Sequence, residues 1–241
     1  MLNIALSLLL PLALAYLAGS IPSAIIFGRL LRGLDPRNLG SRNAGATNAL
    51  RSLGPLPAAL ALITDILKAL AALILAPAAG IAALRAVDPA LMPSIGPRDL
   101  AALCAACAVV GHIFPLFAGF RGGKGVAVAA TAIGALHPWA VPWCVLAFGL
   151  GLTATGYASV GSISAAIVFP FAAFLTGSPL PWSQAARVEG MLPGILALAA
   201  PVAIIATHMG NIRRLMAGSE NRFPKAMIWK RAFNLVRSHF Q

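Results

Sequence analysis

Acidic side chains are scarce in this sequence, since only 6 of its 241 residues are Asp or Glu. Charged residues of both signs make up 10% of the chain, well below the roughly 25% that is usual for soluble domains. Not one Asp, Glu, Lys or Arg occurs between residues 125 and 186. A soluble fold of this size could not bury such a run. The sequence therefore predicts an all-α polytopic membrane bundle, with residues 1–241 forming a single domain.

Cysteines are also few, and the three present do not indicate disulfides. Cys104 and Cys107 have the spacing of a redox motif, but they lie in an apolar helical stretch, where cysteine behaves as a small hydrophobic residue. No cluster of His, Cys and Asp has the spacing of a zinc site. A divalent metal acting on phosphate would need two or more carboxylates, and the chain offers few. We therefore expect a site that works without a metal or another cofactor.

Basic residues outnumber acidic ones by 18 to 6, and the pI is about 11.3. No basic face interleaved with aromatic residues is present, of the kind that RNA-binding proteins use, so we expect no nucleic-acid partner. In a membrane protein such an excess is typical of the positive-inside rule. With the N-terminus outside, most basic residues lie inside, and only Arg85, Arg98 and Arg187 lie outside. This asymmetry places the C-terminus in the cytoplasm.

Stretches of about 20 apolar residues predict the helices that cross the bilayer. The N-terminal stretch is too long, and lacks the basic start, for a cleavable signal peptide, so it is counted as the first helix. Seven stretches result, the fourth of them short: 4–28, 55–76, 100–118, 126–137, 139–156, 162–179 and 191–212. Four unusual loops then share the cytoplasmic face, where we expect the chemistry: 35–54, 119–125, 156–162 and 208–220.

The loop at 119–125 places glycines on both sides of Lys124. It is not a Walker A loop, because Ala118 and Gly125 stand where that pattern needs Gly and Ser or Thr. Glycines such as Gly122 and Gly123 let backbone N–H groups approach an anion closely, and Lys124 adds a full charge. The loop therefore suits phosphate. The alternative is a tight turn with a lysine that only fixes topology.

The loop at 35–54 is rich in hydrogen-bond donors, and Asp35 is its only acid. Such a loop suits a phosphate monoester, which arginine binds with two parallel hydrogen bonds. The alternative is a hydrophilic loop that sets topology. The donors are Ser41, Arg42, Asn43, Thr47, Asn48, Arg51 and Ser52.

Polar residues within the apolar stretches are further candidates. His208 and Asn211 are spaced i, i+3 at the end of the last helix, where they would share one face. His208 could act as a general base or as an orienting donor. Asp65 and Lys68, also spaced i, i+3, predict a structural ion pair, and His112 suits a packing role. Asp35 and Glu220 are the two carboxylates expected on the cytoplasmic side.

Several motifs in a fixed order resemble the bacterial membrane glycerol-3-phosphate acyltransferases that use acyl phosphate as donor, the PlsY family. The resemblance covers nearly the whole chain. The motifs are GSIPSA at 19–24, GSRNAGATNALR at 40–51, Asp65 with Lys68, GHIFPLFAGFRGGKG at 111–125, and HMGNI at 208–212 with Gly218 and Glu220.

The resemblance implies seven helices, an outside N-terminus and an active site on the cytoplasmic face of the bacterial inner membrane. It implies that glycerol 3-phosphate attacks acyl phosphate, giving 1-acylglycerol 3-phosphate and inorganic phosphate. It implies central roles for Ser41, Arg51, Lys124, His208 and Asn211. Substrate contacts would come from Asn43, Gly45, Thr47, Asn48, Gly122, Gly123 and Ser162; Asp65, Lys68, His112 and Glu220 would be structural.

The sequence departs from the family pattern at a few positions. The family often has Gly where Arg42 stands, and Arg where Gly156 and Thr207 stand. Two other functions use similar residues. A small anion transporter would need polar groups near the middle of the membrane, and an enzyme using a CDP-activated donor would need several metal-binding carboxylates. The sequence leaves the oligomeric state open, with a monomer as the simplest case.

Overall fold

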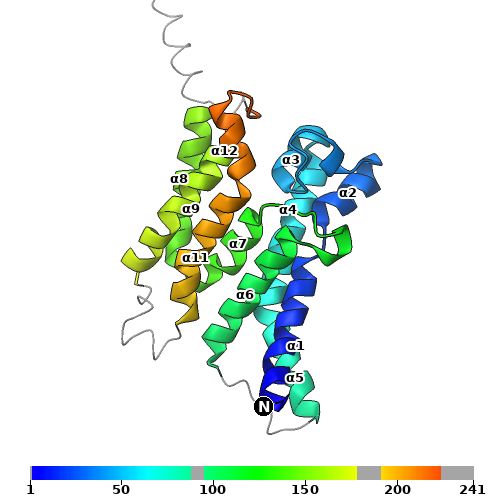
Figure 1. Cartoon of the computed structure of the whole chain (residues 1–241), viewed down its shortest axis with the longest axis vertical. Coiled ribbons are helices and arrows are strands. Elements are labelled where there is room, and N and C mark those ends of the chain that lie inside the picture. Colours follow the sequence, from blue (N-terminus) through cyan, green and yellow to red (C-terminus); the bar gives the residue numbers. More distant parts are fainter. Residues whose placement is uncertain (1, 88–94, 178–190, 224–241) are drawn as a thin grey trace, which may run out of the picture. The chain divides into compact units, whose positions relative to one another are not determined.

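The computed structural model of the chain describes residues 2–87, 95–177 and 191–223. The regular elements in these ranges are all helical (Figure 1). Within these ranges five helical stretches are long and apolar enough to cross a membrane, or six if a bent pair of helices counts as one span. Of the basic residues used to orient the bundle, Arg187 and those from Lys225 to Arg237 lie outside the described residues. The chain divides into two compact units, residues 1–138 with 178–198 and residues 139–177 with 199–241.

The first predicted span is interrupted in the first unit. Helix α1 (Leu2–Gly19) ends before the segment 20–22, and α2 (Ser23–Arg32) begins after it. Pro22 lacks an N–H group and stands at the N-cap of α2, so the helical ladder cannot run through it. The carbonyl oxygen of Ile21 then becomes available to a side chain, which matters for the site below.

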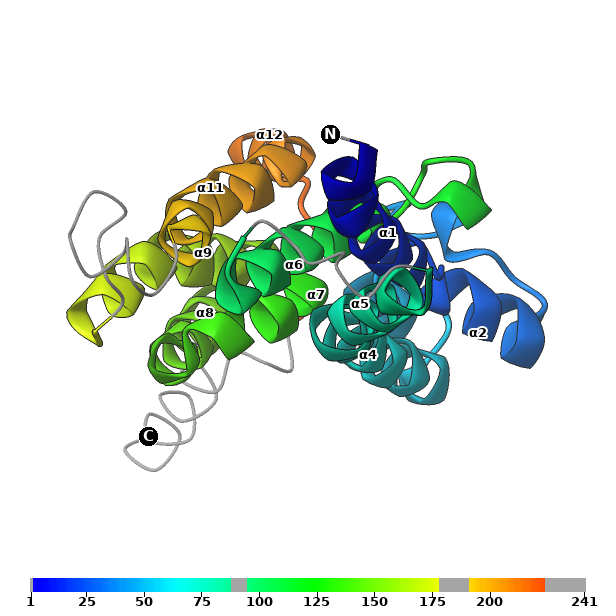
Figure 2. The same ribbon diagram turned by 90° about the horizontal axis from the view of Figure 1, so that it is seen from below.

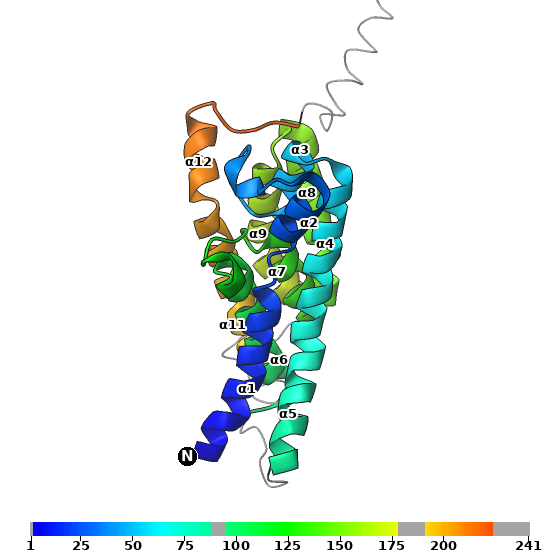
Figure 3. The same cartoon turned by 90° about the vertical axis from the view of Figure 1, so that its right-hand side faces the viewer.

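The second and third predicted spans are confirmed as long helical stretches. Helix α4 (Pro55–Leu70) continues through a π-helical segment, η2 (Ala71–Leu75), into α5 (Ala76–Val87), and α6 (Pro97–Ile113) follows. Helices α1, α5 and α6 contact one another, as the end-on view of Figure 2 and the side view of Figure 3 show. Glycines permit this approach, because a Cβ on Gly19 would lie 2.2 Å from the Ala108 carbonyl oxygen.

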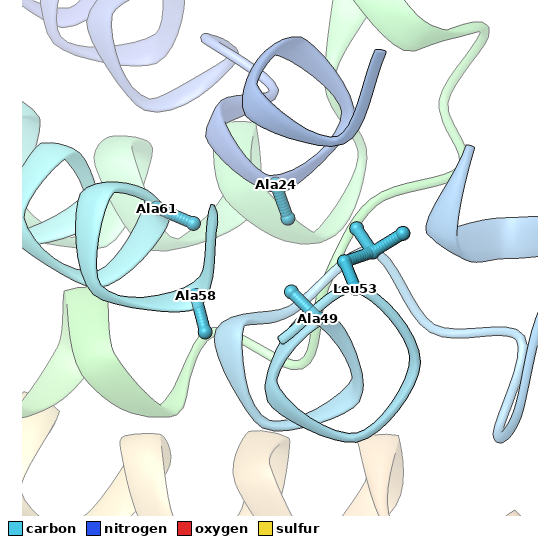
Figure 4. Close-up of a cluster of buried hydrophobic side chains, with 5 residues drawn as sticks. All are labelled: Ala24, Ala49, Leu53, Ala58 and Ala61. Atoms are coloured by element: carbon cyan, nitrogen blue, oxygen red, sulfur yellow. The ribbon is translucent and has the colours of Figure 1, made fainter. Parts of the chain in front are cut away.

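The segment 35–54, which was expected to be a loop, contains regular structure. It contains a 3₁₀ turn, η1 (Pro36–Asn38), and a helix, α3 (Ala46–Ser52). Two residues of this segment, Ala49 and Leu53, pack against small residues of α2 and α4 in a buried cluster (Figure 4). Packing between elements thus fixes a segment whose polar composition had suggested a loop. The other members of the cluster are Ala24, Ala58 and Ala61.

The remaining elements of the first unit are short. A 3₁₀ turn, η3 (Leu116–Ala118), follows α6, and the Gly-rich loop leads into α7 (Val126–Ala132) with η4 (Gly134–Leu136) behind it. This is the short fourth stretch of the sequence. It is apolar but not long enough to count among the five candidate spans.

In the second unit α8 (Val141–Thr155) and α9 (Ala158–Leu175) lie side by side, after the turn η5 (Pro138–Ala140). The predicted break falls at Gly156, whose φ of 77° ends α8. The prediction was wrong about the next helix, however, because α9 already begins at Ala158. Ser162 therefore lies inside a helix and not in the expected loop.

The last predicted span is divided into α11 (Leu192–Thr207) and α12 (Met209–Met216), which meet at an angle of 52°. The break falls at His208, whose backbone N–H donates to Ile205 O at 2.9 Å. The imidazole Nδ1 takes the place of that N–H and binds Ile204 O at 2.8 Å. A side chain that enters the ladder in this way is a common cause of a helix bend.

Candidate active site

Asn48 organises the segment that precedes α3. Its Oδ1 accepts a hydrogen bond from Ser41 N at 2.9 Å, and its Nδ2 lies within 3.0 Å of the carbonyl oxygens of Pro36, Leu39 and Asn43. The side chain is buried. Both polar atoms of this side chain are therefore bonded within the protein, where they shape the loop before α3.

The other candidates of this segment lie on or just before α3. Ser41, Asn43 and Gly45 precede the helix, and their side chains or backbone are only partly buried. Thr47 is exposed on the first turn of α3, and Arg51 is half-buried one turn later. The structure therefore brings Ser41 and Arg51 onto one short, well-ordered segment.

Asp35 and Arg37 brace the start of the same segment. The Arg37 guanidinium donates from Nη2 to Asp35 Oδ2 at 2.8 Å and from Nε to Oδ1 at 3.1 Å. Arg29 adds one more bond to this carboxylate at 2.9 Å. The hydrogen bond from the Arg37 side chain lowers the pKa of Asp35 to about 2. Neither residue was singled out as a site residue, although the i, i+2 spacing of opposite charges was a visible signal.

The Gly-rich loop lies against the end of α6. Gly122 N donates to Ile113 O at 3.2 Å, and Gly123 N donates to His112 O at 3.1 Å. A Cβ on Gly122 would lie 2.0 Å from His112 O, and one on Gly123 would lie 2.1 Å from the His112 Nε2 atom. The expectation that these two N–H groups point to an anion therefore has to be revised, because they are bonded within the protein. The two glycines let the loop approach α6, and Lys124 follows, half-buried.

Three helical segments meet in a buried charged cluster beneath this loop. The ion pair predicted from the i, i+3 spacing is confirmed, since Lys68 Nζ lies 2.9 Å from Asp65 Oδ1. The same ammonium group donates to Ile21 O at 2.7 Å and lies 3.0 Å from Nδ1 of His112. Asp65 also accepts a short hydrogen bond from Ser23 Oγ. The packing role expected for His112 is thus part of a larger network.

Glu220 organises the candidate residues of the second unit. Its Oε1 accepts hydrogen bonds from Asn211 Nδ2 at 2.6 Å and Ser159 Oγ at 3.1 Å, and its Oε2 accepts one from Arg214 Nε at 2.8 Å. Burial alone would raise the pKa of Glu220, but the bonds from Asn211 and Arg214 outweigh it, so this pKa lies below its usual value. Ser159 was missed, although it is a polar residue one turn before Ser162 in an apolar helix.

His208 is buried at the bend between α11 and α12. Because a carbonyl oxygen only accepts, the bond to Ile204 O requires a hydrogen on Nδ1, which leaves Nε2 as the basic nitrogen of the neutral ring. Ser162 donates to Ala158 O at 3.0 Å, within its own helix.

The predicted site residues thus form two groups. One group belongs to the first unit and surrounds α3 and the Gly-rich loop; the other belongs to the second unit and surrounds Glu220 and His208. In the described part of the chain no three His, Cys, Asp or Glu residues come together as metal ligands could. These features define the class: a helical integral membrane protein whose polar and basic groups gather in segments at helix ends.

Comparison with known proteins identifies the family. A family model described as glycerol-3-phosphate acyltransferase matches residues 9–218. The glycerol-3-phosphate acyltransferase of Chlorobaculum tepidum is 39% identical over 232 residues, which cover 90% of this chain and 97% of that protein. The one of Pelodictyon phaeoclathratiforme is 36% identical over 234 residues, with the same coverage. The chain belongs to the glycerol-3-phosphate acyltransferase family.

Solved structures agree with this assignment. The crystal structure of PlsY, an integral membrane glycerol 3-phosphate acyltransferase, in its glycerol 3-phosphate form superposes with a TM-score of 0.71 at 32% identity. The match covers 92% of this chain and 98% of that one. The lysophosphatidic acid form of the same protein gives a TM-score of 0.69.

Proposed function

We propose that this protein transfers the acyl group of an acyl phosphate to the 1-hydroxyl of glycerol 3-phosphate. The 1-hydroxyl oxygen forms an ester bond to the acyl carbonyl carbon as the bond from that carbon to the phosphate oxygen breaks. The products are 1-acylglycerol 3-phosphate, a lysophosphatidic acid, and inorganic phosphate. The observation that carries the proposal is that Arg51 and Lys124 lie on two segments of one compact unit, in a chain of this family. The two forms of the PlsY structure correspond to the acceptor and to its acylated product.

In this proposal the first unit binds phosphate. Arg51 and Lys124 neutralise the charge on the phosphate groups, with Ser41 beside them, while Asn43, Gly45 and Thr47 line the same segment. Gly122 and Gly123 contribute by placing Lys124. Acyl phosphate is a mixed anhydride with a good leaving group, so positioning and charge neutralisation supply much of the rate. No metal is needed in this scheme, because basic side chains replace it.

The proton of the attacking hydroxyl goes, in our proposal, to a phosphate group of the substrate. A phosphomonoester has its second pKa near 6, so it is largely dianionic at neutral pH. Nδ1 of His208 donates to the backbone carbonyl of Ile204, which fixes the orientation of the ring. His208 then positions the acceptor through its other nitrogen, and Asn211 and Ser162 belong to the same group of residues.

The membrane topology is part of the proposal. Seven helices would cross the bilayer if the short stretch formed by α7 and η4 also spans it. The N-terminus would lie outside, and the active site would lie on the cytoplasmic face of the bacterial inner membrane. The excess of basic residues on that face supports this orientation. The fit of one family over residues 9–218 supports a single functional domain.

Coupling between the two substrates tests the function. The purified protein in detergent micelles is given an acyl phosphate, and phosphate release is measured without acceptor, with glycerol 3-phosphate, and with glycerol as the acceptor that lacks phosphate. We expect release and lysophosphatidic acid formation only with glycerol 3-phosphate. Equal release without acceptor would contradict an acyltransferase of this specificity. Flux of glycerol 3-phosphate into proteoliposomes without an acyl product would favour a transporter.

A further inference from the structure

The buried cluster of Asp65, Lys68 and His112 is more than an ion pair in a membrane span. A lysine ammonium carries three hydrogens, and the structure offers three acceptors: Asp65 Oδ1 at 2.9 Å, Ile21 O at 2.7 Å and His112 Nδ1 at 3.0 Å. The three acceptors come from α4, from the break between α1 and α2, and from α6. The ammonium group is therefore fully bonded, as a charge in an apolar environment requires.

The Lys68 ammonium also fixes the state of the histidine ring. Because an ammonium group only donates, Nδ1 of His112 is assigned as the acceptor of this bond, which places a ring hydrogen on Nε2. Asp65 Oδ1 lies farther from the same Nδ1, at 3.5 Å. The ring is thus held at its Nδ1 side by a group that is itself held by two other segments. Its Nε2 side is turned to the Gly-rich loop.

The contact between the ring and the loop is close. A Cβ on Gly123 would lie 2.1 Å from Nε2 and 2.9 Å from Cε1 of His112, so the ring occupies the space that a side chain would need. The main chain of His112 also accepts the hydrogen bond from Gly123 N at 3.1 Å. Both the side chain and the carbonyl group of His112 therefore contact Gly123, and Lys124 is the next residue in the chain.

We propose that His112 is a positioning residue for the reaction: its ring, anchored by Lys68 and Asp65, sets the path of the Gly122–Gly123 backbone and so places Lys124 for a substrate phosphate. This inference rests on the proposed function, which gives Lys124 its role. It explains why a charged cluster is maintained inside an apolar span beneath the loop.

The substitution His112→Asn separates the bond to Lys68 from the contact with Gly123. The asparagine side chain can keep an acceptor for Lys68 near the place of Nδ1, but it is too short to reach Gly123. We expect the melting temperature to stay close to that of the wild type. The KM of the substrate whose KM rises in Lys124→Ala should rise by about 10- to 10²-fold, since a displacement of about 1 Å can have an effect of about 10²-fold. An unchanged KM in a folded His112→Asn protein would overturn the proposal.

Two alanine substitutions in the loop provide a matched comparison. In Gly123→Ala the three atoms nearest to the new methyl group are ring atoms of His112, whereas in Gly122→Ala the nearest are the backbone oxygens of His112 and Ile113 and a ring carbon of Pro115. Replacing the His112 ring by the shorter asparagine should therefore relieve the collision in Gly123→Ala and leave the collision in Gly122→Ala. We expect His112→Asn/Gly123→Ala to be no worse than His112→Asn alone, and His112→Asn/Gly122→Ala to be worse than either single variant. If the effects of the single substitutions on KM multiply in both double variants, the result would contradict a rigid contact between the His112 ring and Gly123.

The outcomes are distinguishable from failure of the proposed function. If Lys124→Ala has wild-type kinetics, the site assignment itself is wrong. If Lys124→Ala is impaired while His112→Asn is normal, only the positioning role fails. Should His112→Asn not fold, Gly123→Ala decides by itself, because a folded Gly123→Ala protein with a wild-type KM would overturn the proposal.

Discussion

Arg37 donates from Nη1 to the carbonyl oxygen of Ala118 at 2.9 Å, and so joins two segments that lie 81 residues apart in the sequence. One segment leads to Ser41 and Arg51, and the other leads to Lys124. The remaining nitrogens Nε and Nη2 of the same guanidinium hold Asp35. A planar group with donors on several sides can make all of these bonds at once, which a lysine could not.

Arg37→Gln should weaken both the first unit and its binding of substrate. It removes the bond to Ala118 O and the two bonds to Asp35, and hydrogen bonds to charged groups contribute about 1.5–3 kcal/mol. We expect a lower melting temperature and a higher KM. Arg29→Gln is the control, because Arg29 makes a single bond to Asp35 and its side chain is 64% exposed. Equal effects of both substitutions would contradict the bracing role.

Acid provides a second readout of the same pair. The pKa of Asp35 is lowered in the folded protein to about 2, so its stabilising contribution is complete above its usual value near 4 and is lost as the pH falls from there toward 2. The part of the stability that depends on pH between 5 and 3 should therefore be smaller in Arg37→Gln than in the wild type. Thermal unfolding across this range measures it.

Lys124→Ala and Arg51→Ala should each impair catalysis. In the proposed site each variant would lose an interaction with substrate phosphate worth about 1.5–3 kcal/mol, or roughly 10- to 10²-fold in kcat/KM. Ser52→Ala is the control on α3, since the Ser52 hydroxyl bonds to Asn48 O within the protein at 2.6 Å. Wild-type kinetics for Lys124→Ala or Arg51→Ala, at matched amounts of folded protein, would reject that residue.

His208→Asn and His208→Ala should differ in activity. An asparagine can donate to Ile204 O in place of Nδ1 and so keep the bend, whereas an alanine cannot. If His208 positions the acceptor, the Asn variant keeps much more activity than the Ala variant, and the acidic limb of the pH–rate profile survives because it belongs to the substrate phosphate. If His208 is the base, both variants fall together by about 10²–10⁴-fold and the limb disappears. Profiles of kcat/KM against pH decide between them.

Excess chelator should leave the acyl transfer unchanged. The chain has few carboxylates, and basic side chains at the candidate site can neutralise phosphate charge directly. The assay is the formation of lysophosphatidic acid with and without chelator, with Mg²⁺ added back in a third sample. Activity that falls with chelator and returns with Mg²⁺ would show that a metal takes part.

Arg42→Gly should stabilise the segment before α3. Arg42 has a φ of 57°, in the left-handed region that non-glycine residues adopt at a cost of about 1–2 kcal/mol. Its side chain is exposed, and the resemblance to the acyltransferase family already places Gly at this position. Part of the gain is offset by the greater freedom of glycine in the unfolded chain, so we expect about 1 kcal/mol or less. A lower melting temperature would contradict this explanation.

Local patterns in the sequence were sufficient for the class of protein and for much of its secondary structure. Apolar runs predicted the helices because a helix must be apolar over about 20 residues to cross the hydrocarbon core of the bilayer. The i, i+3 spacing of Asp65 and Lys68 predicted their ion pair because one helix places both on one face. The prediction of a loop at 156–162 was wrong, since α9 already starts at Ala158. The residues Ala158, Ser159 and Val160 are compatible with a helix as well as with a loop, so the sequence did not mark where the helix begins.

Only the tertiary structure decided how the polar residues are used. The bonds from Lys68 to Ile21 and His112 join residues more than 40 positions apart, so they depend on how α1, α4 and α6 pack and not on any local pattern. The same holds for Glu220, which follows α12 and accepts a hydrogen bond from Ser159 of α9. Composition determined that this chain is a membrane protein with basic, donor-rich segments. Packing determined which donors are bonded within the protein and which segments they hold in place, because a buried polar group must find its partner wherever the fold brings one.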